Sequence, residues 1–277
     1  RGMISCTDNK GGEVLLQNPV LLVLFWVFVL VLAGFPPFPS FFGKWQLVIG
    51  LADNCQFAVI AALLIGSLFE AVYLFRWLGE AIKLPVAEGL TLQTPLSRLW
   101  PVLLFGILLP VGGYLFSRLT PGFDGFLMVS VAFALALMLL DYLPAWIKNS
   151  LTIAGLLLYA SLVYPLIEGD LIRFVFAVIF VGGGLLTLIA GYSVKGKRMG
   201  FFPFAILMYA GLIGLIEAQN LLQFFFAWEL MTLGSYILII RGKKSMLHAL
   251  NYMLFSLGGA YMIMMGISLS VFGTQGL

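Results

Sequence analysis

The sequence has 277 residues, of which 62% are hydrophobic and only 10% are charged. A soluble domain averages about 25% charged residues, because it needs a polar surface. The net charge of +3 is spread between apolar segments and forms no separate basic domain of the kind that binds nucleic acid. No segment alternates as a β-barrel strand does, so the composition predicts an all-α polytopic membrane protein.

Cysteine usage argues against a metal centre in this chain. Cys6 and Cys55 are the two cysteines, they are far apart, and neither belongs to a Cys-x-x-Cys motif. Iron–sulfur clusters and structural zinc sites usually need four ligands, mostly cysteines. We therefore expect no metal site and no cofactor-binding site here.

Nine apolar runs are long enough to span a bilayer, which takes about 20 residues. They lie at 19–50, 55–79, 99–117, 122–140, 143–167, 171–193, 201–218, 221–240 and 246–272. The first run is too long for one straight helix and contains Pro36-Pro37 near its middle, where proline removes a backbone donor and clashes with the preceding turn. We predict a broken helix there, its unwound residues covered by protein or lining a water-filled cavity. Two short helices joined by a loop are the alternative.

The basic residues support this number of spans. If each run crosses once, one face of the membrane receives twelve of the fifteen Lys and Arg residues, and the other face receives only Arg118 and Arg173. The remaining one, Lys44, lies inside the first run. The positive-inside rule then places the loops after the second, fourth, sixth and eighth runs on the cytoplasmic or equivalent side.

Three charged residues, Lys44, Glu70 and Glu229, stand well inside predicted helices. A charge at the bilayer centre costs about 3 kcal/mol on insertion scales, and such groups are usually functional. Glu229 has aromatic and aliphatic neighbours, so it can hold or release a proton depending on where a cation lies. It is a candidate proton relay, with a static interhelical hydrogen bond as the alternative.

Three further candidates follow from position. Lys44 comes directly after the proline break and can exchange a proton with water there; snorkelling to the interface is the alternative. Glu70 lies near the centre of the second run, and our hypothesis is that it pairs with Lys44. His248, the single histidine, begins the last run and titrates near neutrality, although a histidine at a helix end is more often a surface residue.

Two motifs resemble those of one family, the antiporter-like proton-channel subunits. These comprise the pumping subunits of complex I, the large subunits of Mrp-type antiporters and membrane subunits of energy-converting hydrogenases. Residues 224–231, FFFAWELM, resemble the fifth helix of this family, whose channel glutamate matches Glu229. Residues 32–37, LAGFPP, and 41–45, FFGKW, resemble the broken twelfth helix, whose half-channel terminal residue matches Lys44.

The order of these resemblances predicts two incomplete modules. Residues 1–120 resemble helices twelve to fourteen of a first module, and residues 121–277 resemble helices one to six of a second, with the join near Thr120-Pro121-Gly122. We expect a piece of a longer chain, since the first residue is Arg1 and no signal-peptide pattern follows it. The lysine that partners Glu229 in the family would then lie beyond Leu277. Asn251 stands where many members have lysine, and Glu70 stands where we expect a neutral residue.

The resemblance implies a function in ion translocation. The chain would be a non-catalytic, proton- or sodium-translocating membrane subunit of a redox-driven complex, of the NADH dehydrogenase or the energy-converting hydrogenase type. Its partners would be other membrane subunits, peripheral redox subunits and lipid, and not nucleic acid. The redox subunits would hold iron–sulfur clusters, with nickel or flavin as further candidates. We expect a multi-pass protein of a prokaryotic inner membrane or an energy-converting organelle.

Two other functions fit the same motifs. An Mrp-type cation/proton antiporter subunit would have no redox partner. A structural membrane subunit with a vestigial channel would hold peripheral domains in place, which the asparagine at position 251 mildly favours.

Overall fold

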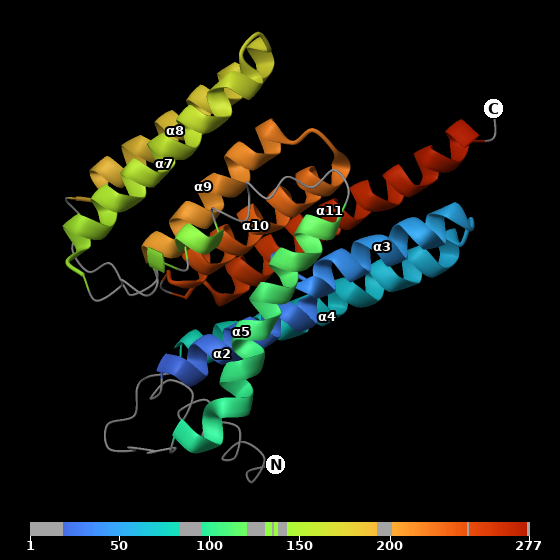
Figure 1. The fold of residues 1–277 in the computed structure, drawn as a ribbon, viewed down its shortest axis with the longest axis horizontal. Helices are drawn as coiled ribbons and strands as arrows, with labels where there is room; N and C mark the ends of the chain where they lie inside the picture. Colours follow the sequence, from blue (N-terminus) through green and yellow to red (C-terminus); the bar gives the residue numbers. More distant parts are fainter. Residues whose placement is uncertain are drawn as a thin grey trace. The chain divides into compact units, whose positions relative to one another are not determined.

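The computed structural model describes residues 19–83, 96–120, 131–134, 136–137, 143–192, 201–242 and 244–275. The chain divides into two compact units (Figure 1). Unit 1 comprises Arg1–Phe116 and Lys244–Leu277, and unit 2 comprises Ser117–Lys243. These units differ from the two predicted modules, because residues 244–277 pack with the beginning of the chain. The predicted modules are defined by their resemblance to family helices and not by packing. The join near Thr120 therefore stays a prediction.

Helices are the only regular elements in the described residues, as the composition predicts. Five of them are long and apolar enough to span a membrane, and three shorter apolar segments accompany them. The fold class predicted from the sequence, an all-α polytopic membrane protein, is confirmed. Most of the fourth predicted run, 122–140, lies outside the described residues. The helices are α2 (Pro19–Ala33), α3 (Pro39–Asp53), α4 (Phe57–Lys83), α5 (Leu96–Leu119), α7 (Ala145–Ile167), α8 (Leu171–Ala190), α9 (Phe201–Glu217), α10 (Leu221–Ile240) and α11 (Met246–Gln275).

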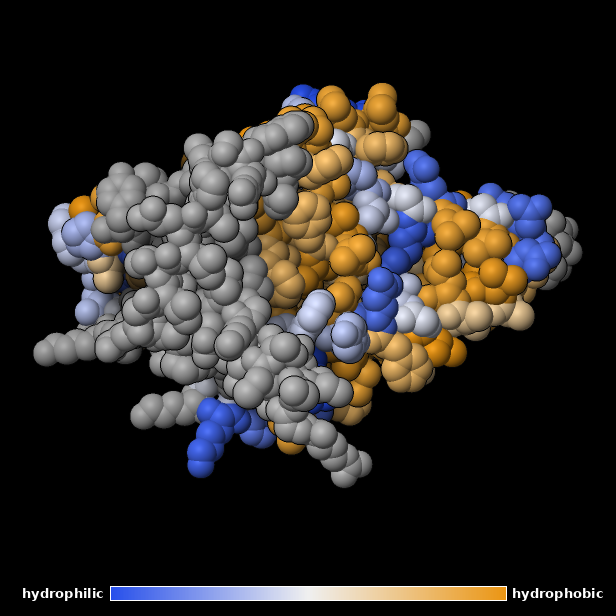
Figure 2. Space-filling view, turned by 90° about the horizontal axis from the view of Figure 1, so that it is seen from below, coloured by the Kyte–Doolittle hydropathy of each residue, from blue (hydrophilic) through white to orange (hydrophobic). Residues whose placement is uncertain are grey.

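Apolar side chains also cover much of the described surface (Figure 2). Leu171, Ile172 and Leu186 of α8 are 75%, 71% and 70% exposed. A soluble protein rarely exposes apolar surface so extensively. The surface therefore suits hydrocarbon as its solvent.

The first run is broken at the predicted prolines, between α2 and α3. Gly34 has a φ of 75°, its N–H donates to the Val31 carbonyl at 3.1 Å, and the Phe35 N–H donates to the Leu30 carbonyl at 2.9 Å. This pair of bonds is a Schellman ending, which favours glycine at the left-handed position. Pro39 then starts α3 at the first helical position, where a missing N–H costs nothing.

The break is covered by protein, as the membrane requires. Residues 33–38 are all buried. The ring of Phe35 packs edge-on against Phe75 of α4, with centroids 5.0 Å apart. A Cβ at Gly113 of α5 would overlap the carbonyl oxygen of Pro37, so α5 approaches the unwound backbone as only glycine allows. Irregular backbone at membrane depth thus lies inside the fold.

One face of α4 completes the core of unit 1, where α4 contacts α2, α3 and α11. Its buried residues recur every three or four positions, as expected of one helical face. They are Ile60, Leu64, Ser67, Ala71, Leu74, Phe75 and Leu78.

In unit 2, two glycines set the spacing of α9 and α10. A Cβ at Gly211 would lie 2.5 Å from the backbone nitrogen of Met231, and a Cβ at Gly234 would lie 2.6 Å from that of Met208. The pairing of early α9 with late α10 makes the two helices antiparallel. Small residues at such contacts let membrane helices approach closely. α7 packs against α8 and α9, and α8 also contacts α9 (Figure 1).

Replacing Gly211 by Ala should destabilise unit 2 by about 1–3 kcal/mol, because the added methyl group meets backbone atoms that cannot rotate away. Thermal unfolding in mild detergent would measure the loss. Gly183 of α8 is the matched control, since a Cβ there meets nothing within 4 Å. Equal melting temperatures for Gly211→Ala and Gly183→Ala would contradict the close contact.

Candidate functional site

Lys44 lies at the helix break in unit 1. Its Nζ donates to the carbonyl oxygen of Ala33 at 3.1 Å and lies 3.5 Å from the hydroxyl of Tyr261 on α11. The same nitrogen is 5.6 Å from the centroid of the Tyr261 ring, a distance suited to a cation–π interaction. Lys44 therefore turns back toward the break rather than snorkelling along α3.

Local structure explains why an ammonium group is stable there. Ala33 is the last residue of α2, and the final carbonyls of a helix carry partial negative charge and have no partner within the helix. Gly34 leaves room for the side chain, since a Cβ at this position would lie 2.9 Å from the Lys44 Nζ. Because Gly34 has no side chain, it allows both the left-handed turn and the close approach of the Lys44 side chain.

Glu229 is the buried acid of unit 2. It is 2% exposed and lies near the middle of α10. The backbone on both sides of it, at Ala227 and Met231, is the stretch that contacts Gly211 of α9. The tight α9–α10 contact therefore holds the carboxylate at a fixed depth.

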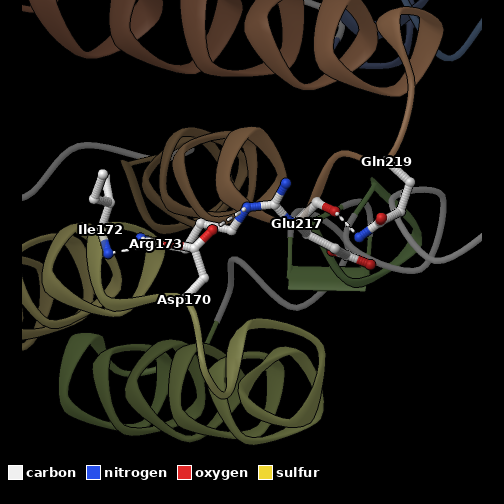
Figure 3. Close-up of polar contacts among 5 residues, drawn as sticks. All are labelled: Asp170, Ile172, Arg173, Glu217 and Gln219. Carbon is white, nitrogen blue, oxygen red and sulfur yellow. Dashed lines mark hydrogen bonds and ion pairs between the residues drawn. The ribbon is translucent and has the colours of Figure 1, made fainter.

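Side-chain hydrogen bonds cap the start of α10, the helix that carries Glu229. The Asn220 side chain accepts the N–H of Gln223 at 2.9 Å, and the buried Gln223 side chain accepts the N–H of Gln219 at 2.8 Å. This is a close variant of a capping box. Figure 3 shows the preceding turn, where the Gln219 side chain donates to the Glu217 carbonyl at 2.9 Å.

A similar cap begins α8, also drawn in Figure 3. Asp170 accepts the N–H groups of Ile172 and Arg173, both at 3.1 Å, and its carboxylate lies 3.3 Å from the Arg173 Nε. These contacts are exposed, so Arg173 stabilises the start of α8 and is not a partner of the buried Glu229.

Two more polar groups of α10 share the face of Glu229. Thr232 and Tyr236 follow it by three and seven residues, and both are 0% exposed. Positions with this spacing lie on one side of a helix. The three side chains form a buried polar stripe that leads toward the carboxyl end of α10.

Buried polar residues on α7 were missed by the sequence interpretation, which counted Lys148 only as a basic residue near a loop. Lys148 is 8% exposed, and its Nζ lies 5.6 Å from the ring centroid of Phe202 on α9. Asn149 donates to the carbonyl of Leu188 at 2.7 Å. A lysine at the sixth position of the predicted run 143–167 was the available signal, but its burial depends on α9.

The predicted site residues are divided between the two units. Lys44, Glu70 and His248 belong to unit 1, whereas Glu229 belongs to unit 2. Glu70 and His248 are exposed. Among the described residues no hydrogen bond or ion pair joins Lys44 to Glu70, so the hypothesised pair is absent from this structure. Tyr261, which sequence reasoning missed, contacts Lys44 instead.

The described residues contain no cluster of three or more His, Cys, Asp or Glu side chains that could hold a metal ion. Cys55 is an exposed free thiol, and Cys6 lies outside the described residues.

Comparison with curated proteins gives partial matches to quinone oxidoreductase subunits. The chain is 32% identical over 95 residues to NAD(P)H-quinone oxidoreductase chain 4 of the Anthoceros angustus chloroplast, which is 33% of this chain and 19% of that protein. It is 33% identical over 105 residues to NADH-quinone oxidoreductase subunit N of Desulforudis audaxviator, which is 33% of this chain and 21% of that protein. Both relatives are named as components of quinone oxidoreductases.

The resemblance predicted from the fifth- and twelfth-helix motifs is therefore confirmed at the level of these homologues. The chain spans about a fifth of the length of the curated relatives it matches. No family model matches the chain, and no solved structure matches it. The homologues and the apolar helices also confirm an integral, multi-pass membrane protein.

Replacing Gly34 by Ala should destabilise unit 1 by about 1–3 kcal/mol, because the left-handed turn is strained for alanine and the new methyl group crowds the Lys44 side chain. Gly43→Ala, one residue before the lysine, is the control, since a Cβ there meets nothing within 4 Å. Thermal melting in detergent should separate the two variants. A Gly34→Ala protein as stable as the Gly43→Ala protein would argue against the observed turn.

Proposed function

We propose that this chain is a proton-translocating membrane subunit of an NADH-quinone oxidoreductase-like complex. The observation that carries the proposal is the placing of Lys44 at a buried helix break, where its Nζ meets a backbone carbonyl and a tyrosine hydroxyl. The buried acid Glu229 supports it from unit 2. The complex I homologues supply the class of complex.

At the break, Lys44 would take up and release the proton. As an ammonium it donates to the Ala33 carbonyl, and the Tyr261 ring and hydroxyl lie beside it. When it gives the proton to water or to an acid, the amine loses its charge and its attraction to the end of α2 weakens. The break and the charge state of Lys44 would therefore be coupled.

In unit 2, Glu229 would be the carboxylate that holds the proton between transfers. Thr232 and Tyr236 are hydroxyl groups that both donate and accept, so the stripe could pass a proton along α10. The antiparallel pairing brings the end of α10 to the start of α9, where Lys148 lies over Phe202. A path from Glu229 toward Lys148 would stay within unit 2.

The redox chemistry would belong to partner subunits. Peripheral subunits with iron–sulfur clusters would oxidise the donor, and neighbouring membrane subunits would complete the channel. The names of the relatives favour quinone oxidoreductases over hydrogenases. Metal analysis of the native complex tests this: iron without nickel supports the proposal, iron with nickel indicates a hydrogenase-type partner, and neither metal indicates a stand-alone antiporter.

Glu229→Gln should reduce proton translocation by about a hundredfold, because loss of a positioned proton-transfer group typically costs at least that much. The measurement is the internal pH of vesicles that contain the native complex, with donor and quinone supplied. Glu168→Gln is the control, since Glu168 is an exposed acid at the end of α7. Full translocation by the Glu229→Gln complex would overturn the assignment.

Lys44→Arg should abolish translocation as completely as Lys44→Met, because arginine keeps the charge and does not release its proton. Tyr261→Phe keeps the ring and removes the hydroxyl, so we expect a smaller loss. Tyr252→Phe on the same helix should leave the rate unchanged. Translocation that survives Lys44→Arg would show that charge, rather than proton exchange, is what Lys44 supplies.

A further inference from the structure

Between Ile65 and Tyr73, the exposed face of α4 carries one charged residue, Glu70, among apolar and aromatic residues. Ile65, Phe69 and Tyr73 are 56%, 70% and 62% exposed. Gly66 and Glu70 are exposed beside them. These five residues recur every three or four positions and form one stripe, which we call the Glu70 face.

Glu70 lies at the centre of this helix. α4 has 27 residues, and as many precede Glu70 as follow it. A helix of this length and hydropathy crosses the membrane, which puts Glu70 near the bilayer midplane. A charge facing hydrocarbon at that depth costs about 3 kcal/mol on insertion scales. Protein rather than lipid therefore suits this face as a neighbour.

Within the part of the chain that the structure describes, no cation is paired with Glu70. Apart from Lys44, all its Lys and Arg residues lie near the ends of the apolar runs or between them. The Lys44 Nζ is directed at the Ala33 carbonyl. Within the described residues, no hydrogen bond or ion pair involves Glu70. A complementary charge at midplane depth is therefore what a neighbouring helix packed on this face would have to bring.

The shape of the face suits a second helix. Gly66 lies one turn before Glu70, and a Cβ at that position would meet nothing within 4 Å. A partner backbone can approach closely over such a residue. The large rings of Phe69 and Tyr73 then flank the carboxylate and can exclude lipid from it.

We propose that the Glu70 face binds a transmembrane helix of a partner subunit, which places a Lys or Arg side chain against Glu70 near the midplane. The charge of Glu70 selects a basic partner, and the apolar residues around it bury the contact. This inference goes beyond the proposed function and stands whether or not Glu229 transfers protons.

Photo-crosslinking in the native complex tests the location. With p-benzoylphenylalanine in place of Phe69, we expect a cross-link to an apolar segment of another subunit that contains Lys or Arg, identified by mass spectrometry. The same substitution at Leu186 of α8, also 70% exposed, measures non-specific capture. Cross-links only to lipid, only to residues 117–243 of this chain, or to the same peptide from Leu186 would overturn the proposal.

Glu70 variants test the chemistry. Glu70→Gln should lower the amount of that partner retained after mild solubilisation about tenfold, and Glu70→Lys should lower it further, because like charges repel. Glu70→Asp should retain most of the partner, which shows that the variant helix still folds. Glu80→Gln on the same helix is the control, since it removes only an exposed ion pair with Arg76. Unchanged retention in Glu70→Gln would overturn the charge pairing.

Discussion

The need to satisfy backbone groups inside a membrane governs unit 1. A helix that stops at membrane depth leaves carbonyls without partners, and hydrocarbon offers none. In unit 1, three residues together satisfy or cover these backbone groups. Gly34 turns the chain so that two N–H groups bond back into α2, Lys44 donates to the last carbonyl of α2, and Gly113 lets α5 cover the unwound prolines. The same arrangement places Lys44, an ionisable group, inside the fold. Lys44 therefore both bonds the end of α2 and is a candidate for proton transfer.

Unit 2 also buries an ionisable group, Glu229, but it does so by close packing of two helices rather than at a helix break. Gly211 and Gly234 bring the backbones of α9 and α10 together, and the Asn220 side chain caps the start of α10. Glu229 is consequently held in a narrow contact with little freedom to reach solvent. An acid in such a place exchanges protons through neighbouring polar groups. Thr232 and Tyr236 are the groups that α10 itself provides.

Much of this architecture could be predicted from the sequence, because apolar runs and prolines act locally. The helix breaks at Pro36-Pro37, as the chemistry of proline predicts. Helices occupy eight of the nine predicted runs, and most of the remaining run, 122–140, lies outside the described residues. Side-chain partners could not be predicted in the same way. Tyr261 lies 217 residues from Lys44, and no local pattern connects them. The hypothesised Lys44–Glu70 pair is absent because the other face of α4 packs into the core of unit 1. That packing leaves Glu70 exposed on the outer face of the helix.

In the proposed function, oxidation chemistry in partner subunits drives protons through this chain and its neighbours. The most direct measurement is the pH inside sealed vesicles that contain the native complex, recorded while NADH and a quinone are added. The account predicts a pH change that follows electron transfer, that collapses on addition of a protonophore, and that persists without sodium. Quinone reduction at full rate with no change in internal pH would contradict it.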